Sequence, residues 1–334
     1  MTAAGSTPGR APGRAPDDAV WHPAPQPVAD PSLPAQVRVY EVGPRDGLQA
    51  EPQVLPAEVK AELCRRLLRA GVPALELTSF VPPRWVPQLA DAEEVVAAVP
   101  VPDGVRGVAL VPNLRGLDRA LAAGVGEVAV VASATESFAR ANLNATVRGA
   151  VAAAAEVTAA ARAADVPVRA YLSMAFGDPW EGPVSVADVA ARSAELYAAG
   201  AGTVALGDTI GTGTPVHVAT VVDAVAAAGV PRAALALHLH DTYGQALGNV
   251  QAGLRAGVTE FDSSVGGLGR CPFARGATGN LATEDLVWLL HGLGIETGID
   301  LEELVRISQW TGNWLGRPVP SRVAAALTAA GVGA

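Results

Sequence analysis

Two histidines separated by one residue, His238 and His240, end an apolar stretch that reads ALALHLHDTYGQ. Alternate side chains of a β-strand point to opposite faces, so both imidazoles project from one face. Neutral imidazole nitrogens are common ligands of divalent metal ions. Two satisfied structural histidines are the alternative interpretation. A pair at the end of a strand, followed at once by Asp241, favours the metal site.

Oxygen ligands for such a site are available elsewhere in the chain. Asp46 follows an apolar run in the segment EVGPRDGLQ, and Asn280 ends a glycine-rich stretch. Mg²⁺ and Mn²⁺ accept this mixture of ligands and keep open positions for a substrate that chelates through two oxygens. Zinc fits less well, because structural zinc favours thiolates and Cys271 is the sole candidate.

Three charged side chains are further candidates for the site. Arg45, beside Asp46, is either a surface ion-pair partner or a donor fork for a developing oxyanion. Glu76 alternates with Leu75 and Leu77 in an apolar run, so as part of a β-strand its side chain would point to the opposite face from theirs, toward the interior. A buried carboxylate needs a partner, and Arg45 is the natural choice. Asp208, after the run TVALG, is a candidate substrate contact.

The glycine-rich stretch 263–280 contains Cys271. So many glycines predict a mobile loop. Where such a loop covers an active site, it commonly acts as a lid that excludes water. Cys271 is either an inert thiol or a proton donor and acceptor, and its polar surroundings favour the second role.

Eight short apolar runs alternate with longer helical stretches, most of which end in glycine. This order predicts an α/β fold, the (β/α)₈ or TIM barrel, with an active site at the carboxyl ends of the strands. An open doubly wound sheet is the alternative, but no GxGxxG follows the first run. The predicted strands are 37–42, 73–79, 105–111, 126–132, 166–175, 202–207, 233–240 and 259–265, and the predicted helices are 56–70, 91–99, 114–123, 145–164, 185–199, 215–228, 243–256 and 283–291.

The chain divides into three parts. Residues 1–35 are rich in proline and alanine and are expected to form a disordered arm. Residues 36–298 are expected to form the barrel, which is the catalytic domain. Residues 299–334 are expected to add helices that pack on it.

Composition excludes several classes of function. Half of the 334 residues are hydrophobic and 17% are charged, which is enough for a sizeable core. The net charge of −9 argues against nucleic-acid binding, and no apolar stretch is long enough for a membrane span. Two cysteines are too few for a disulfide framework. We therefore expect a cytoplasmic protein.

Five segments resemble the motifs of the hydroxymethylglutaryl-CoA lyases, which are metal-dependent TIM-barrel enzymes. The resemblance implies cleavage of 3-hydroxy-3-methylglutaryl-CoA to acetyl-CoA and acetoacetate, a retro-Claisen reaction of leucine degradation, by a homodimer. It covers about 37–317 and is carried by EVGPRDGLQ, ELTSFVPPRWVPQLAD, LGDTIGTGTP, HLHDTYGQAL and GLGRCPFARGATGNLATEDL.

The resemblance also implies a role for each candidate residue. Asp46, His238, His240 and Asn280 would bind Mg²⁺ or Mn²⁺. Arg45 would contact the acyl-CoA substrate, Glu76 would support the site, and Cys271 would be the active-site thiol. Asp46, His238 and Cys271 remain alternatives for the base and the acid.

Two arginines depart from the pattern of the family. Arg270 stands where a second glycine is expected before the cysteine, and Arg275 adds another charge to the loop. They could contact the CoA phosphates or stiffen the loop. Two other enzymes remain alternatives, namely a lyase for a longer branched 3-hydroxyglutaryl-CoA and a Claisen-condensing synthase of the isopropylmalate or homocitrate type.

Overall fold

A closed barrel of parallel strands organises the computed structural model, which describes residues 23–270 and 279–332. Each described strand pairs with the next in sequence, and the first also pairs with the last. The predicted TIM barrel is thereby confirmed. The strands are β1 (Arg38–Glu41), β2 (Ala74–Ser79), β3 (Arg106–Leu110), β4 (Glu127–Ser133), β5 (Val168–Ser173), β6 (Thr203–Asp208), β7 (Leu235–Leu239) and β8 (Glu260–Ser263).

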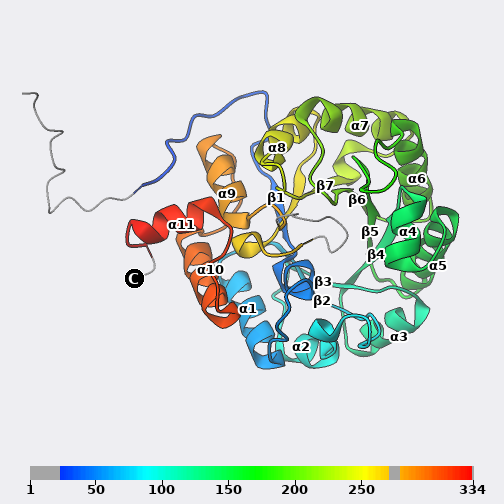
Figure 1. Cartoon of the computed structure of the whole chain (residues 1–334), viewed down its shortest axis with the longest axis horizontal. Coiled ribbons are helices and arrows are strands. Elements are labelled where there is room, and N and C mark those ends of the chain that lie inside the picture. The colour runs from blue at the N-terminus through cyan, green and yellow to red at the C-terminus, as the bar shows by residue number, and fades with distance from the viewer. Residues whose placement is uncertain (1–22, 271–278, 333–334) are drawn as a thin grey trace, which may run out of the picture.

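Helices form a ring around these strands, and α10 and α11 lie outside the ring next to α9 (Figure 1). The extra C-terminal helices that the sequence predicts are therefore present. The helices are α1 (Ala57–Arg69), α2 (Ala92–Ala98), α3 (Leu114–Ala122), α4 (Glu136–Leu143), α5 (Val147–Ala163), α6 (Val186–Ala198), α7 (Pro215–Ala227), α8 (Ala246–Arg255), α9 (Thr283–Gly292), α10 (Leu301–Leu315) and α11 (Arg322–Ala329).

Short helical turns complete the described chain. They are η1 (Gly43–Gly47), η2 (Pro87–Leu89), η3 (Arg232–Ala234) and η4 (Val265–Gly267). Helix α4 is not among the helices that the sequence predicts, and its eight residues lie between β4 and α5. It ends at Asn144, which adopts the left-handed conformation with φ 51°.

The described part of the N-terminal arm, residues 23–35, is not free of the barrel. The amide of Val28 donates to the carbonyl oxygen of Gly292 at 2.9 Å, and the amide of Glu296 donates to that of Ala35 at 2.9 Å. The expectation of a wholly disordered arm is therefore wrong for this part. Carbonyl oxygens at the end of a helix lack partners within the helix, and the arm supplies a donor to one of them at the end of α9.

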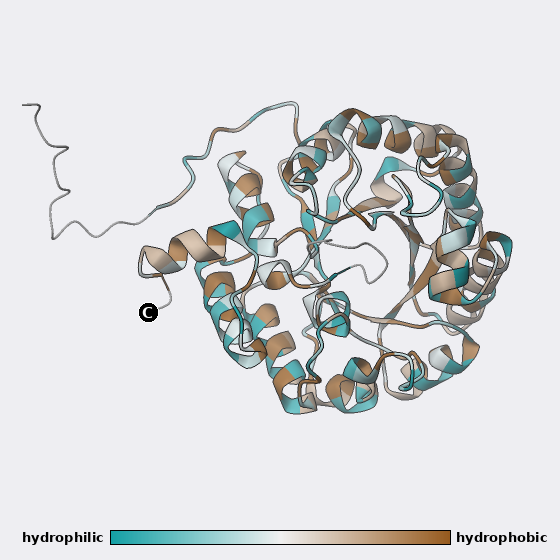
Figure 2. Cartoon of the chain, viewed as in Figure 1, coloured by the Kyte–Doolittle hydropathy of each residue, from teal (hydrophilic) through white to brown (hydrophobic). Residues whose placement is uncertain are grey.

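The apolar core has an outer layer between strands and helices. Leu235, Leu237 and Leu239 of β7 belong to it, whereas Ala236 points into the barrel. Figure 2 shows hydrophilic and hydrophobic colours alternating along the helices of the ring, as expected for helices with one buried face. The alternation predicted for β7 therefore sends His238 inward.

The barrel interior is unusual because it mixes small and polar side chains. TIM barrels typically fill this space with layers of branched aliphatic residues. Here Tyr40, Tyr171 and Arg169 fill it, each buried. The alanines that make room for them, one on each of four strands, are Ala74, Ala129, Ala205 and Ala236. Among the described helices, none is long and apolar enough to cross a membrane.

Candidate active site

The turn η1 after β1 places Arg45 and Asp46 at the barrel mouth. Its π-helical turn is closed by the amides of Arg45, Asp46 and Gly47, which donate to the carbonyl oxygen of Val42 at 3.1, 2.8 and 3.2 Å. Gly43 starts the turn, and a Cβ there would lie 2.6 Å from a carboxylate oxygen of the buried Glu41. Short π-helical segments occur frequently at functional sites.

The end of β7 presents the two histidines at the same mouth, His238 within the strand and His240 directly after it. The Nε2 atoms of His238 and His240 lie 3.3 Å apart, and both side chains are nearly buried. Nδ1 of His238 lies 3.0 Å from Oδ2 of Asp262 on β8. A metal-binding histidine usually hydrogen-bonds a carboxylate or carbonyl through its other nitrogen, and His238 has that arrangement.

Asn280 reaches the site because the chain returns alongside β7. The amide of Asp241 donates to the carbonyl oxygen of Gly279 at 3.2 Å, and that of Leu281 donates to Leu239 at 2.9 Å. Asn280 therefore lies opposite His240 in an antiparallel bridge. Its Nδ2 donates to Oδ2 of Asp46 at 2.8 Å.

These side chains fit a divalent metal ion. One ligand atom each from Asp46, His238 and His240 lies within 4.8 Å of the others. Oδ1 of Asn280 is buried and has no hydrogen-bond partner among residues 23–270 and 279–332, so it is available as a ligand. A buried polar oxygen without a partner is rare, and a metal ion would satisfy it. The structure thus brings the four predicted ligands together.

Arg45 is fixed by two carboxylates. Its Nε donates to Oε1 of Glu76, and its Nη1 donates to Oδ1 of Asp46 at 2.6 Å. Glu76 also accepts from the hydroxyls of Tyr40 at 2.8 Å and Tyr171 at 2.6 Å. The pairing of Glu76 with Arg45 that the sequence predicts is present, and both oxygens of this buried carboxylate accept hydrogen bonds.

The charge of Arg45 controls the ionisation of Asp46. Burial raises the pKa of a carboxyl group, but the guanidinium of Arg45 and the two imidazoles outweigh it and lower the pKa of Asp46 to about 2. Asp46 is therefore an anion at neutral pH, as a carboxyl group must be to bind a metal ion.

Asp208 holds a turn instead of facing the cavity. Its carboxylate accepts from the amides of Thr212 at 2.9 Å and Gly213 at 3.0 Å, and burial raises its pKa to about 6. These bonds fix the backbone after β6. A direct contact of Asp208 with substrate stays a prediction.

Two buried carboxylates hold the start of the glycine-rich loop. Glu41 accepts from the amide of Val265 at 2.9 Å, and both oxygens of Glu284 lie 3.0 Å from the amide of Gly266. Burial raises the pKa of Glu41 to about 7 and that of Glu284 to about 8. Cys271 and Arg275 lie outside the described residues.

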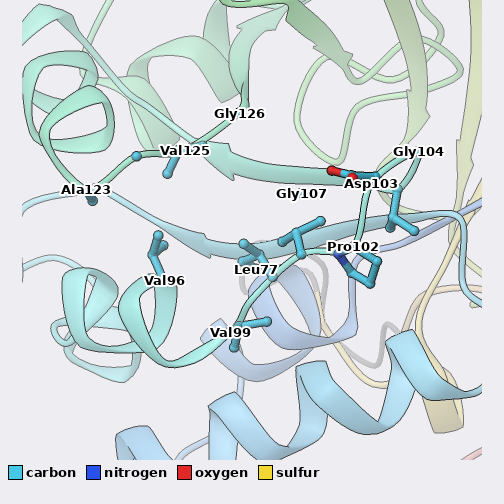
Figure 3. Close-up of a pocket in the computed structure, with 13 residues that line it drawn as sticks. Leu77, Val96, Val99, Pro102, Asp103, Gly104, Gly107, Ala123, Val125 and Gly126 are labelled. Atoms are coloured by element: carbon cyan, nitrogen blue, oxygen red, sulfur yellow. The ribbon is translucent and has the colours of Figure 1, made fainter.

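A cavity of about 710 Å³ joins these groups to the outside of the barrel. Its lining includes Arg45, Asp46, both histidines and Arg270. A second cavity, of about 420 Å³, is lined by residues that precede or start β3 and β4, mostly valine and glycine, with Asp103 as its one charged residue (Figure 3). It lies at the opposite ends of the strands, and its lining contains no histidine, cysteine, lysine or arginine among the described residues.

Sequence reasoning missed four residues of the site. Tyr40 and Tyr171 bind Glu76, while Asp262 binds His238 and is paired with Arg169. The run TEFDSSV offered one signal, because acids two apart on a strand share a face. Nothing in the sequence shows which strand faces which across the barrel.

The structure is a TIM barrel with an Asp-His-His cluster and a buried arginine at the carboxyl ends of its strands. These features define a class of barrel enzymes that can hold a divalent metal ion. The chain belongs to the HMGL-like family, whose profile matches residues 36–310. The resemblance found in the sequence is thus confirmed.

Several proteins that are similar to this chain are named hydroxymethylglutaryl-CoA (HMG-CoA) lyases. The mitochondrial hydroxymethylglutaryl-CoA lyase of Arabidopsis thaliana is 49% identical over 88% of this chain, which spans 63% of that protein's length. A crystal structure of hydroxymethylglutaryl-CoA lyase from Pseudomonas aeruginosa has a TM-score of 0.87 and 47% identity, covering 89% of this chain and 99% of its own. An HMG-CoA lyase from Acinetobacter baumannii, in complex with coenzyme A and 3-methylmalate, has a TM-score of 0.84 and 36% identity, covering 90% and 97%.

Proposed function

We propose that this protein is a carbon–carbon lyase that cleaves 3-hydroxy-3-methylglutaryl-CoA to acetyl-CoA and acetoacetate. The observation that carries the proposal is the cluster of Asp46, His238 and His240 beside the doubly anchored Arg45. The names of the similar proteins support the substrate, and the coenzyme A bound to the Acinetobacter relative supports an acyl-CoA.

Four side chains would hold the cofactor, which we propose to be Mg²⁺ or Mn²⁺. Asp46 and Asn280 supply oxygens, and His238 and His240 supply nitrogens through Nε2. When bound, such an ion supplies Lewis-acid polarisation of the substrate's hydroxyl and carboxylate oxygens. Of these four side chains, His238 also has Asp262 beside its other ring nitrogen, Nδ1.

Arg45 orients and stabilises the acetyl-CoA half of the substrate. Because Nε and Nη1 are fixed by Glu76 and Asp46, the guanidinium cannot rotate, and we assign Nη2 to the thioester oxygen. During cleavage the hydroxyl proton goes to a base, the bond between C2 and C3 breaks, and its electron pair becomes the enolate of acetyl-CoA. A fixed cation beside that oxygen stabilises the developing charge.

The enolate carbon must then take up a proton. The family resemblance implies that Cys271 is the active-site thiol, and of the three candidates for base and acid, which are Asp46, His238 and Cys271, we propose Cys271 as the donor. Glu41 and Glu284 hold the backbone at Val265 and Gly266, a few residues before this cysteine in the chain.

A coupled assay of acetyl-CoA release tests this function. Metal-stripped protein is given 3-hydroxy-3-methylglutaryl-CoA with and without Mg²⁺ or Mn²⁺. We expect release only with metal, and its loss in His238→Ala but not in His217→Ala, a control histidine in α7. Folded protein that releases acetyl-CoA only from a longer branched 3-hydroxyglutaryl-CoA, or that condenses acetyl-CoA with an oxo acid, would overturn the assignment.

We also propose a homodimer, a cytoplasmic location and a role in leucine degradation. The dimer and the pathway are supported by the family resemblance, and the location by the low cysteine content. Light scattering after gel filtration tests the dimer. Growth of a deletion strain on leucine tests the pathway, and cell fractionation tests the location.

A further inference from the structure

Asp262 connects the predicted metal site to the charged interior of the barrel. It pairs with His238 across β7 and β8, and its side chain is buried. Its two oxygens have different partners. Oδ2 lies 3.0 Å from Nδ1 of His238, and Oδ1 accepts from Nη2 of Arg169.

Arg169 cannot change its role in this arrangement. A guanidinium stays charged in proteins and only donates hydrogen bonds. Arg169 is buried, it also pairs with Glu260, and its guanidinium carbon lies 4.0 Å from the ring centroid of Tyr40. These contacts fix its position, so an acceptor atom must stand opposite its Nη2.

The hydrogen bond from Arg169 to Asp262 also determines how Asp262 interacts with His238. A carboxylate accepts on both oxygens, so Nδ1 of His238 must be the donor. The proton of the neutral imidazole then resides on Nδ1, and the lone pair resides on Nε2. Nε2 faces the cluster, 3.3 Å from Nε2 of His240.

We propose that Asp262, held by Arg169, is a positioning residue that fixes His238 in the Nδ1–H tautomer and so sets the affinity of the site for its metal ion. This inference deepens the proposed function, since it concerns the same site. The alternative is that Asp262 only neutralises Arg169 and has no effect on His238.

Asp262→Asn separates the two interpretations because the amide has one acceptor and one donor. The oxygen must face Arg169, which only donates, so the amide NH₂ faces Nδ1 of His238. Nδ1 then has to accept, and the proton moves to Nε2, where it blocks the lone pair. We expect metal affinity to fall by about 10- to 100-fold, as for other outer partners of ligating histidines.

Glu260→Gln is the matched control. Glu260 lies two residues away on β8, is buried to a similar degree and pairs with the same Arg169, but it does not touch His238. The variant removes one charge from the same network. It should lower stability while leaving the His238 tautomer and metal affinity unchanged.

Two measurements on metal-free protein provide the test. Nitrogen-15 NMR of labelled histidine reports the tautomer of His238, assigned with His238→Gln, and Mn²⁺ binding is followed by electron paramagnetic resonance. We expect Nδ1–H in wild type and in Glu260→Gln, and Nε2–H with weakened Mn²⁺ binding in Asp262→Asn.

Three outcomes overturn the proposal. They are an Nε2–H tautomer in metal-free wild type, unchanged tautomer and Mn²⁺ affinity in folded Asp262→Asn, and equal weakening in Glu260→Gln. The wild-type tautomer decides the matter even if Asp262→Asn does not fold. No substrate is used, so a failure here is distinct from a failure of the proposed reaction.

Discussion

Replacing Glu76 by glutamine tests whether the buried carboxylate positions Arg45. Glu76 is fully buried and accepts three hydrogen bonds, from Arg45, Tyr40 and Tyr171. Glutamine has the same shape but carries no charge. Its oxygen can accept from Arg45, and its NH₂ group can donate to a tyrosine hydroxyl that rotates.

The expected loss of stability follows from these three bonds. A hydrogen bond to a charged group contributes about 1.5–3 kcal/mol and a neutral one about 1 kcal/mol. The bond from Arg45 keeps its charged donor, so only the two tyrosine bonds become neutral, and these two conversions cost about 2 kcal/mol. Arg45 keeps its contact with Asp46 at 2.6 Å, so it does not become an unpaired buried charge. Chemical denaturation measures the difference.

The effect on catalysis should exceed that of a general loss of stability. With Nε held less firmly, Arg45 loses part of its alignment. Removing a whole oxyanion donor lowers kcat by about 10²–10³-fold, so we expect a decrease of about 10- to 100-fold in Glu76→Gln. KM should change less, because the interaction strengthens in the transition state.

The control for this experiment is Glu127→Gln. Glu127 is also nearly buried and pairs with an arginine, Arg106, but both lie at the opposite ends of their strands. That variant should lose stability and keep its turnover. A folded Glu76→Gln protein with kcat within about twofold of wild type would refute the assigned role of Arg45 and its anchor.

Three further predictions concern the loop and its stem. Burial raises the pKa of Glu284 to about 8, so the folded state holds the proton, and stability falls as pH rises from about 4.5 to 8, by up to roughly 1.4 kcal/mol per pH unit. In Glu284→Gln, denaturation at several pH values should show a shallower slope, and the remaining slope comes from Glu41 below about pH 7 and Asp208 below about pH 6. Gly279→Ala should weaken Mn²⁺ binding measured on metal-free protein by displacing Asn280, since its Cβ would lie 2.0 Å from a carbonyl oxygen of the loop stem. Cys271→Ser should lower kcat far more than substrate affinity, and unchanged turnover would remove the thiol from the mechanism.

Residue spacing alone located the core of the candidate site. The period of two along β7 sends His238 and His240 into the barrel, and the same rule sends Glu76 inward on β2. The cost of burying Glu76 without a partner indicates Arg45, and the two are paired. These inferences succeed because each depends on one strand or on one strong electrostatic requirement.

The remaining features depend on contacts between distant parts of the chain. Asp262 meets His238 only because β8 pairs with β7 in one register, and Arg169 reaches Asp262 across the barrel from β5. For Asp208, the hydrogen-bond partners of the side chain could not be predicted from the sequence. Its position at the end of a strand predicts a substrate contact, but its oxygens bind backbone amides of the turn that follows.

Burying the charged side chains of the barrel interior costs stability, so their presence needs another explanation. A buried ion pair is weak evidence for stability, because desolvation cancels much of the attraction, and apolar residues of similar volume often do as well. This barrel nevertheless buries Arg169 fully, with Glu260 and Asp262 as partners. Alanines on the neighbouring strands leave the space for it, where other barrels place branched aliphatic residues. An aliphatic interior would pack as well, but it could not hold a carboxylate oxygen against Nδ1 of His238. The arrangement is therefore better explained by the orientation of that imidazole than by the stability of the fold.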